Sequence, residues 1–214
     1  AVKEEVTLYE QASSASFNLA ETGDIVGAND AQLKALSQIS KARIQTALAK
    51  VKPALEVIRD WIAGEKVVIV CYHRKVMDAF QRAFGDTSVS IHGGVPSEFR
   101  SQVVDQFVKD ESKRVFIMQV GISAGLDGIQ KVCNHGVFFE FDWRSGVMLQ
   151  AEDRLWRIGQ LQGVLWSYFV LPSSIDQKFL QVNGQKAWVA SSILDDPARE
   201  AAGEDSPAQP GHLF

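Results

Sequence analysis

The stretch Gln150–Gln160, QAEDRLWRIGQ, is the most informative segment of this 214-residue sequence. On an α-helix, residues spaced by four and seven positions share one face, and Gln150, Arg154 and Arg157 have that spacing. Two guanidinium groups held in a fixed array are suited to neutralising the charge that develops on a phosphoryl group during its transfer. The segment therefore indicates a phosphate-handling site.

A second set of residues in the same segment predicts how its helix packs. Ala151, Leu155 and Ile158 repeat the helical spacing as an apolar stripe. We expect a helix over 147–158 that Gly159 ends. The alternative is a surface helix with solvated charges, and the spacing of the arginines alone would favour it.

Strand-like and helix-like segments alternate along residues 50–194, which predicts a mostly parallel sheet covered by helices on both faces. The expected strands are runs of consecutive apolar residues and do not alternate between apolar and polar positions. Such runs are typical of strands that are buried on both faces of a sheet. Strands are expected at 66–71, ending near 91, at 114–119, 137–141 and 165–171, and helices at 76–84, 98–109, 147–158 and from Ser174 toward Leu194. The fold class is therefore α/β with three layers.

Local signals refine these helices. Pro53 fits the first turn of a helix that Gly64 ends. Ser97 is expected to cap the helix over 98–109. Trp143 and Trp156 are expected to pack rather than to stack on bases. Side chains expected to point inward are Met77, Phe80 and Phe84 on one helix and Phe99, Val103 and Phe107 on another.

Candidate functional residues follow the ends of four expected strands. In open parallel sheets, ligands bind beyond the carboxyl ends of the strands, so these residues should meet at one edge. Glycines there can also form tight turns without any ligand, and a solvated strand end is an equal alternative for a histidine or arginine. The groups are Tyr72-His73-Arg74, His92-Gly93-Gly94, Gly121–Gly128 and Asp142-Trp143-Arg144.

Composition sets bounds on the partners. The formal net charge of −4 argues against a dedicated nucleic-acid-binding domain, so any DNA contact needs a local basic patch or another domain. Cys71 and Cys133 lie in apolar surroundings and are expected to be buried, reduced thiols, as in a cytoplasmic protein. Cys133-Asn134-His135 lacks metal-ligand spacing, so no metal site is predicted. No transmembrane run or signal peptide is seen.

The full QAEDRxxRIGQ string closely resembles motif VI of superfamily 2 helicases and ATPases of the Swi/Snf-like branch, most of all the annealing helicases and their phage relatives. The similarity continues through residues 50–190 in the family's order. Lys66–Arg74 resembles motif IV, Ser123–Ile129 resembles motif V, and Val137–Trp143 resembles the segment between motifs V and VI. Weaker similarity covers Ile91–Val95, Asp105–Phe107 and Ser174–Lys178.

The resemblance implies a C-terminal RecA-like lobe of an ATP-dependent DNA helicase or translocase. Arg154 and Arg157 would be arginine fingers, with ATP and Mg²⁺ bound mainly by an N-terminal lobe, because no GxxxxGK[ST] or DExH-like sequence occurs here. Nucleotide contacts would come from Gln150, Gly125, Asp127 and Gly128. Contacts to the backbone of double-stranded or branched DNA would come from Tyr72, His73, Arg74, His92, Gly93, Gly94, Gly121 and Ser123.

Two positions depart from the family's pattern. Asp127 falls where many superfamily 2 members, but few of the Swi/Snf branch, place a carboxylate near the ATP ribose. Gly121 stands where a serine or threonine is common, so a hydroxyl contact to DNA there is in doubt, and Ser123 is the candidate substitute.

The sequence suggests three segments: a helical linker from the preceding lobe over residues 1–49, the RecA-like domain over 50–194, and a flexible tail over 195–214. Such a chain alone should hydrolyse no ATP and should reside in the cytoplasm of a bacterium or a phage-infected host. Two alternatives remain: a lobe that binds DNA or protein without supporting hydrolysis, and an unrelated α/β enzyme. The second would need a GxGxxG after the first strand, where Cys71–Arg74 stands instead.

Overall fold

The structure is a computed structural model that describes residues 25–122, 126–181 and 184. Several sequence expectations lie outside these residues. They concern the start of the linker, Ser123 and Gly125, the far end of the last helix, and the tail over 195–214.

Five parallel strands form one sheet in the order β2-β3-β1-β4-β5. Each pairs in parallel with its neighbour, as the continuous apolar runs predict. β4 begins two residues earlier and ends three residues earlier than the sequence suggested, and β5 is shorter. The strands are β1 Val67–Cys71, β2 Ser88–Ile91, β3 Val115–Gln119, β4 His135–Phe138 and β5 Leu165–Tyr168.

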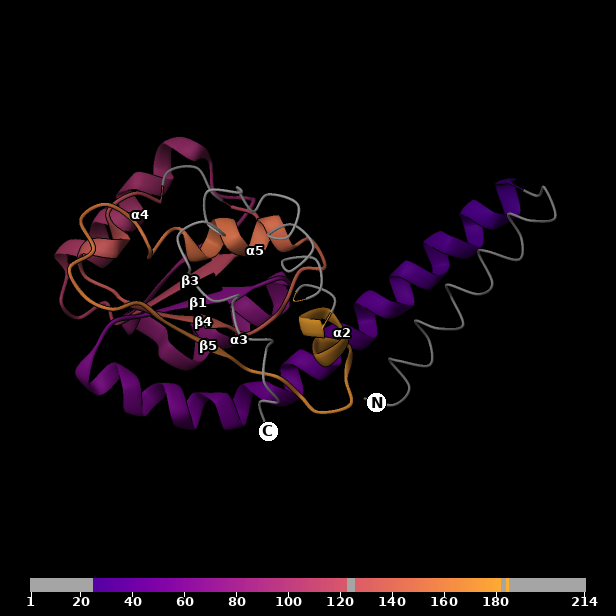
Figure 1. Cartoon of the computed structure of the whole chain (residues 1–214), viewed down its shortest axis with the longest axis horizontal. Helices are drawn as coiled ribbons and strands as arrows, with labels where there is room; N and C mark the ends of the chain where they lie inside the picture. Colours follow the sequence, from indigo (N-terminus) through magenta and orange to yellow (C-terminus); the bar gives the residue numbers. More distant parts are fainter. Residues whose placement is uncertain (1–24, 123–125, 182–183, 185–214) are drawn as a thin grey trace, which may run out of the picture.

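Helices cover both faces of the sheet, which gives the three expected layers (Figure 1). The helices are α2 Ile25–Gly64, α3 Arg74–Phe84, α4 Ser97–Lys109 and α5 Ser145–Glu152, and the short 3₁₀ turns are Gly85–Thr87 and Ile129–Lys131. One face packs against α4 and α5, through side chains such as Val68, Phe116 and Phe138. The other packs against α2 and α3, through Ile69, Ile117 and Val137. Alternate residues of each strand therefore supply two separate cores.

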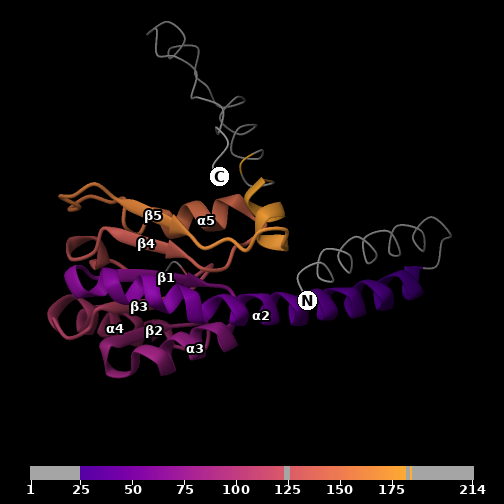
Figure 2. The ribbon, with the colours of Figure 1, turned by 90° about the horizontal axis from the view of Figure 1, so that it is seen from below.

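The long helix α2 differs from the sequence expectation. Pro53 lies in its interior rather than in a first turn, and the helix runs without a break to Gly64. The boundary expected at residues 49 and 50 therefore lies within one helix. Figure 2 shows the C-terminal part of α2 crossing the sheet while its N-terminal part extends beyond it.

Other packing expectations are partly met. Met77, Phe80 and Phe84 are buried as predicted. On α4, Phe107 is buried but Phe99 is half exposed, because Val104 rather than Phe99 turns toward the core. The expected cap by Ser97 is wrong: Pro96 is the residue before the first turn, and no side chain caps it. Both cysteines are free and buried, as expected.

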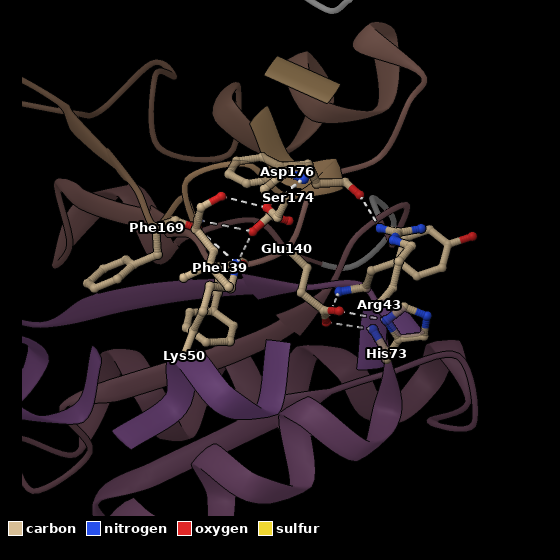
Figure 3. Close-up of polar contacts among 11 residues, drawn as sticks. Arg43, Lys50, His73, Phe139, Glu140, Phe169, Ser174 and Asp176 are labelled. Carbon is tan, nitrogen blue, oxygen red and sulfur yellow. Dashed lines mark hydrogen bonds and ion pairs between the residues drawn. The ribbon is translucent and has the colours of Figure 1, made fainter. Parts of the chain in front are cut away.

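A buried lysine joins α2 to the C-terminal part of the chain (Figure 3). Lys50 is 6% exposed, and its Nζ donates to the carbonyl oxygens of Phe139 and Phe169, both at 2.9 Å, and to Asp176 Oδ2 at 2.5 Å. Asp176 lies in the helical segment 175–181. A single ammonium group thus connects α2, the chain just beyond β4, the chain just beyond β5 and the last described helix.

Candidate functional site

Three loops meet at the carboxyl edge of the sheet, as the sequence predicted. Gln119, the last residue of β3, holds two of them together through its side-chain amide. Its Nε2 donates to the Tyr72 carbonyl at 3.1 Å, and its Oε1 accepts from the Gly93 backbone N–H at 2.9 Å. Sequence reasoning missed Gln119. The only signal was a polar residue that ends an otherwise apolar strand.

The glycine turn after β2 presents its backbone to solvent. Gly93 and Gly94 are exposed, and the Gly94 N–H donates to His92 Nδ1 at 3.0 Å. That bond requires an unprotonated Nδ1. The pKa of His92 lies below its usual value, mainly because burial disfavours the charged ring and because Arg74 lies near. His92 is therefore a neutral turn residue, and its expected contact with the DNA backbone stays a prediction.

His73 lies in the interior instead of at a solvated strand end, and it is bound by a buried glutamate (Figure 3). Glu140, 2% exposed, accepts the backbone N–H groups of Tyr72 and His73 at 2.9 Å each, and its Oε1 lies 2.6 Å from His73 Nδ1. The other ring nitrogen of His73 lies 3.3 Å from Ser40 Oγ on α2. Both nitrogens are engaged, so the expected contact between this ring and a DNA phosphate is not supported. Sequence reasoning also missed Glu140.

The other two residues of that triplet are differently placed. Arg74 is half exposed, and its Nε donates to Asp78 Oδ1 at 2.7 Å. Such an exposed ion pair is weak and can exchange for a phosphate. The ring of Tyr72 is covered by Arg43 of α2, whose guanidinium carbon lies 4.6 Å from the ring centre. Arg43 also donates to the Phe141 carbonyl at 2.6 Å.

A fully buried carboxylate fixes the loop between β4 and α5. Asp142 Oδ1 accepts from the backbone N–H and Nε of Arg144 at 2.9 and 3.0 Å, and Oδ2 accepts from Nη2 at 2.7 Å. Burial by itself raises the pKa of Asp142, but the bonds from Arg144 outweigh it and hold the pKa below its ordinary value. Trp143, expected to pack, is 55% exposed between them.

The loop after β3 contains glycines in conformations that other residues avoid. Gly121 has φ +85° and Gly128 has φ +108°, both in the left-handed region. Asp127 is exposed, two residues before the 3₁₀ turn Ile129–Lys131. Residues 123–125, which include Ser123 and Gly125, lie outside the part of the chain that the structure describes.

The helix expected over 147–158 ends six residues early, because α5 stops at Glu152. From there the chain forms turns, with bonds from Arg154 N to Ala151 O and from Leu155 N to Glu152 O. β5 runs parallel to β4, so the chain must leave α5 and return to the amino ends of the strands. The arginines therefore lie on a returning segment of turns and not on one helix face.

The expected apolar stripe is correspondingly broken. Ala151 and Leu155 are buried, whereas Ile158 is 95% exposed. Trp156, expected to pack, is 71% exposed, and Leu161 further along is 95% exposed. A groove of about 640 Å³ runs along this exposed apolar surface and is lined by Trp156, Arg157, Ile158, Gln160, Leu161, Gln162 and Gly163.

The two candidate arginine fingers are held differently. Arg154 Nε donates to the Gln150 carbonyl at 3.1 Å, within its own turn. Arg157 reaches across to the loop after β3, where its Nε lies 3.4 Å from Asp127 Oδ1, and both side chains are largely exposed. Gln150 is also exposed. The structure thus joins Arg157 to Asp127, two residues that the sequence assigned to the ATP site.

Within the described residues, no cluster of three or more histidine, cysteine or acidic side chains could hold a metal ion. No helix in that part of the chain is both long and apolar enough to cross a membrane.

Comparison with known proteins gives a consistent result. Residues 49–159 match the family described as "Helicase conserved C-terminal domain". The chain is 31% identical over 156 residues to "DNA annealing helicase and endonuclease ZRANB3" of Mus musculus, covering 71% of this chain and 14% of that protein. It is 28% identical over 173 residues to "DNA repair protein RAD5" of Saccharomyces cerevisiae, covering 77% of this chain and 14% of that protein. The chain therefore spans only a small part of these relatives.

A solved structure supports the fold. "Crystal structure of the C-terminal part of Fun30 ATPase domain" superposes with a TM-score of 0.55 at 22% sequence identity, over 64% of this chain and 44% of that one. The parallel sheet, the match over 49–159 and these relatives agree with one another. The chain belongs to the helicase conserved C-terminal domain family and is a C-terminal RecA-like lobe of the Swi/Snf-like branch of superfamily 2.

Proposed function

We propose that this lobe supplies Arg157, assisted by Arg154, as arginine fingers to an ATP site that an N-terminal lobe of the same protein completes. The observation that carries the proposal is the state of Arg157. Its side chain is 45% exposed, and its Nε lies 3.4 Å from a carboxylate oxygen of Asp127, whose side chain is 73% exposed. An exposed ion pair contributes about 1 kcal/mol or less, so a γ-phosphate can replace it at little cost.

The surroundings of Arg157 support a second lobe as the partner. Trp156, Ile158 and Leu161 are largely exposed on the same segment of turns. A cluster of large apolar side chains on a surface marks an interaction site. The Mus musculus relative, of which this chain spans 14%, is much longer, and a parent of similar length would have ample sequence to cover this surface.

ATP and Mg²⁺ would be held mainly by that other lobe. On this side, Gln150 and Arg154 would contact the nucleotide, together with Gly125, Asp127 and Gly128. Gly128 has no Cβ and a positive φ, so a ligand could approach the backbone of this loop closely. The guanidinium of Arg157 would neutralise charge that develops on the transferred phosphoryl group.

DNA would bind at the carboxyl edge of the sheet. Support comes from the exposed backbone of Gly93 and Gly94, the half-exposed guanidinium of Arg74 and the exposed Gly121. Backbone N–H groups and an arginine suit sugar-phosphate contacts rather than base reading. Such contacts should weaken as salt rises, because counterions compete for the phosphates.

The test is DNA-stimulated ATP hydrolysis by the full-length parent, wild type beside Arg157→Ala. An arginine finger contributes about 10³–10⁵ in rate in other phosphoryl-transfer enzymes, so the variant should lose turnover while its circular dichroism is unchanged. Arg82→Ala, an exposed arginine on α3, is the matched control and should keep wild-type activity.

Retention of activity by Arg157→Ala would overturn the arginine-finger proposal. If neither the wild type nor the variant hydrolyses ATP but both bind DNA, the lobe is instead a non-hydrolysing DNA- or protein-binding module.

A further inference from the structure

A buried glutamine connects the loop after β3 to the turns that carry Arg157. Gln130, on the 3₁₀ turn Ile129–Lys131, is 4% exposed. Its Oε1 accepts from the Gly128 backbone N–H at 2.9 Å, and its Nε2 donates to the Ile158 carbonyl at 3.3 Å. One side-chain amide thus uses its acceptor on one loop and its donor on the other.

The two segments that Gln130 joins are those that face the nucleotide in the proposed function. A second connection, the ion pair between Arg157 and Asp127, lies outside at the surface. That pair is open to water and salt, and in the proposed mechanism a phosphate displaces it. The bonds of Gln130 are sheltered by burial, so they persist when the ion pair opens.

A second glutamine adds another hydrogen bond between the same two segments. Gln160 Nε2 donates to the Cys133 carbonyl at 2.9 Å, which fixes the segment after Arg157 against the chain leading into β4. The segment just after Arg157 is therefore tied to residues 128–133 at two points, Ile158 and Gln160, while the Arg157 side chain stays partly exposed.

We propose that Gln130 is a positioning residue for ATP hydrolysis: its amide sets the place of Arg157 relative to the loop over 126–128. Any displacement of that loop would then move the arginine with it. This inference rests on the proposed function of Arg157.

Two substitutions separate the roles of the amide. Gln130→Met keeps the length of the side chain and removes both hydrogen bonds, whereas Gln130→Glu keeps an acceptor for Gly128 and loses the donor to Ile158. Gln102→Met, on an exposed position of α4, is the matched control. The measurement is kcat and the KM for ATP of the full-length parent with saturating DNA, at a temperature where circular dichroism shows every variant folded.

We expect both Gln130 variants to lower kcat about 10- to 100-fold, because a small displacement of a catalytic group is that costly. The KM for ATP should change little, because the arginine acts mainly in the transition state. Gln102→Met should match the wild type. A Gln130→Glu variant with wild-type kcat would overturn the inference, since the bond to Ile158 would then have no role in turnover.

Coupling to Arg157 distinguishes positioning from a purely structural effect. In an Arg157→Lys background, which retains a charge but not the guanidinium, Gln130→Met should have a much smaller effect on kcat, because the misplaced group is already altered. An equal loss in both backgrounds would overturn the inference. If Arg157→Ala is inactive while Gln130→Met is fully active, only the inference fails. If Arg157→Ala is fully active, the proposed function fails with it.

Discussion

Removing the carboxylate that partners Lys50 should destabilise the lobe strongly. In Asp176→Ala the ammonium stays buried and loses the carboxylate that neutralises it, while the carbonyl groups of Phe139 and Phe169 remain. Breaking a buried ion pair in this way costs about 3–5 kcal/mol. Because two acceptors remain, we expect the lower end, about 3 kcal/mol. For a domain of this size, that corresponds to a fall in Tm of roughly 6–12 °C.

The assay is urea unfolding of the 214-residue chain, monitored by the helical circular dichroism signal, which gives the free energy of unfolding. The double variant Lys50→Met with Asp176→Leu removes both charges, so it should recover most of the loss. Lys52→Met, an exposed lysine on the same helix, is the control and should change the stability little. A loss below about 1 kcal/mol in Asp176→Ala would refute the reasoning, since the pair would then behave like an exposed one.

Two other substitutions test the packing and the electrostatics of the sheet. Gly136→Ala should destabilise by about 1–3 kcal/mol in thermal unfolding, because a Cβ there would lie 2.3 Å from the Trp166 ring; a neutral result would mean that the ring moves aside freely. The pKa of Asp142 is lower in the folded chain than in the unfolded chain, so the ionised carboxylate stabilises the fold at pH values above the unfolded-state pKa. This stabilisation is lost as the pH falls through the lower pKa of the folded state. The stability gap between wild type and Arg144→Gln should therefore be full at pH 7 and shrink below about pH 4, whereas exposed Arg59→Gln should show no such trend; a gap independent of pH would contradict the assignment.

The sheet was predictable because its signal is local. A strand buried on both faces needs apolar residues at successive positions, and Val67–Cys71 and the first four residues of β3, from Val115 to Met118, have them in sequence. The parallel arrangement then follows from the helices between the strands, and with it the meeting of Tyr72 and Gly93 at one edge.

The helix of the arginines was mispredicted because spacing cannot show where a helix ends. Ala151, Leu155 and Ile158 suit a helical stripe, yet the chain must turn back toward β5 after Glu152. That requirement comes from the topology of the whole sheet. The result is an exposed Ile158, which no local pattern would suggest.

The buried polar connections could not be found from sequence for a related reason. Lys50 and Asp176 are 126 positions apart, and His73 and Glu140 are 67 apart. Each residue alone looks like an ordinary surface charge. Only the folded chain shows that α2 places Lys50 within hydrogen-bond distance of the residues just after β4 and β5.

The continuity of α2 has a practical consequence for gene design. The match to the helicase conserved C-terminal domain begins at residue 49. Nevertheless Thr46 and Ala47 are each 3% exposed, and Arg43 donates to the Phe141 carbonyl. A chain that starts at residue 49 would lack the part of α2 that packs against one of the two cores. The apolar surface exposed in this way would favour aggregation. Expression of a minimal lobe should therefore start well upstream of Ser40, although the match to the family begins only at residue 49.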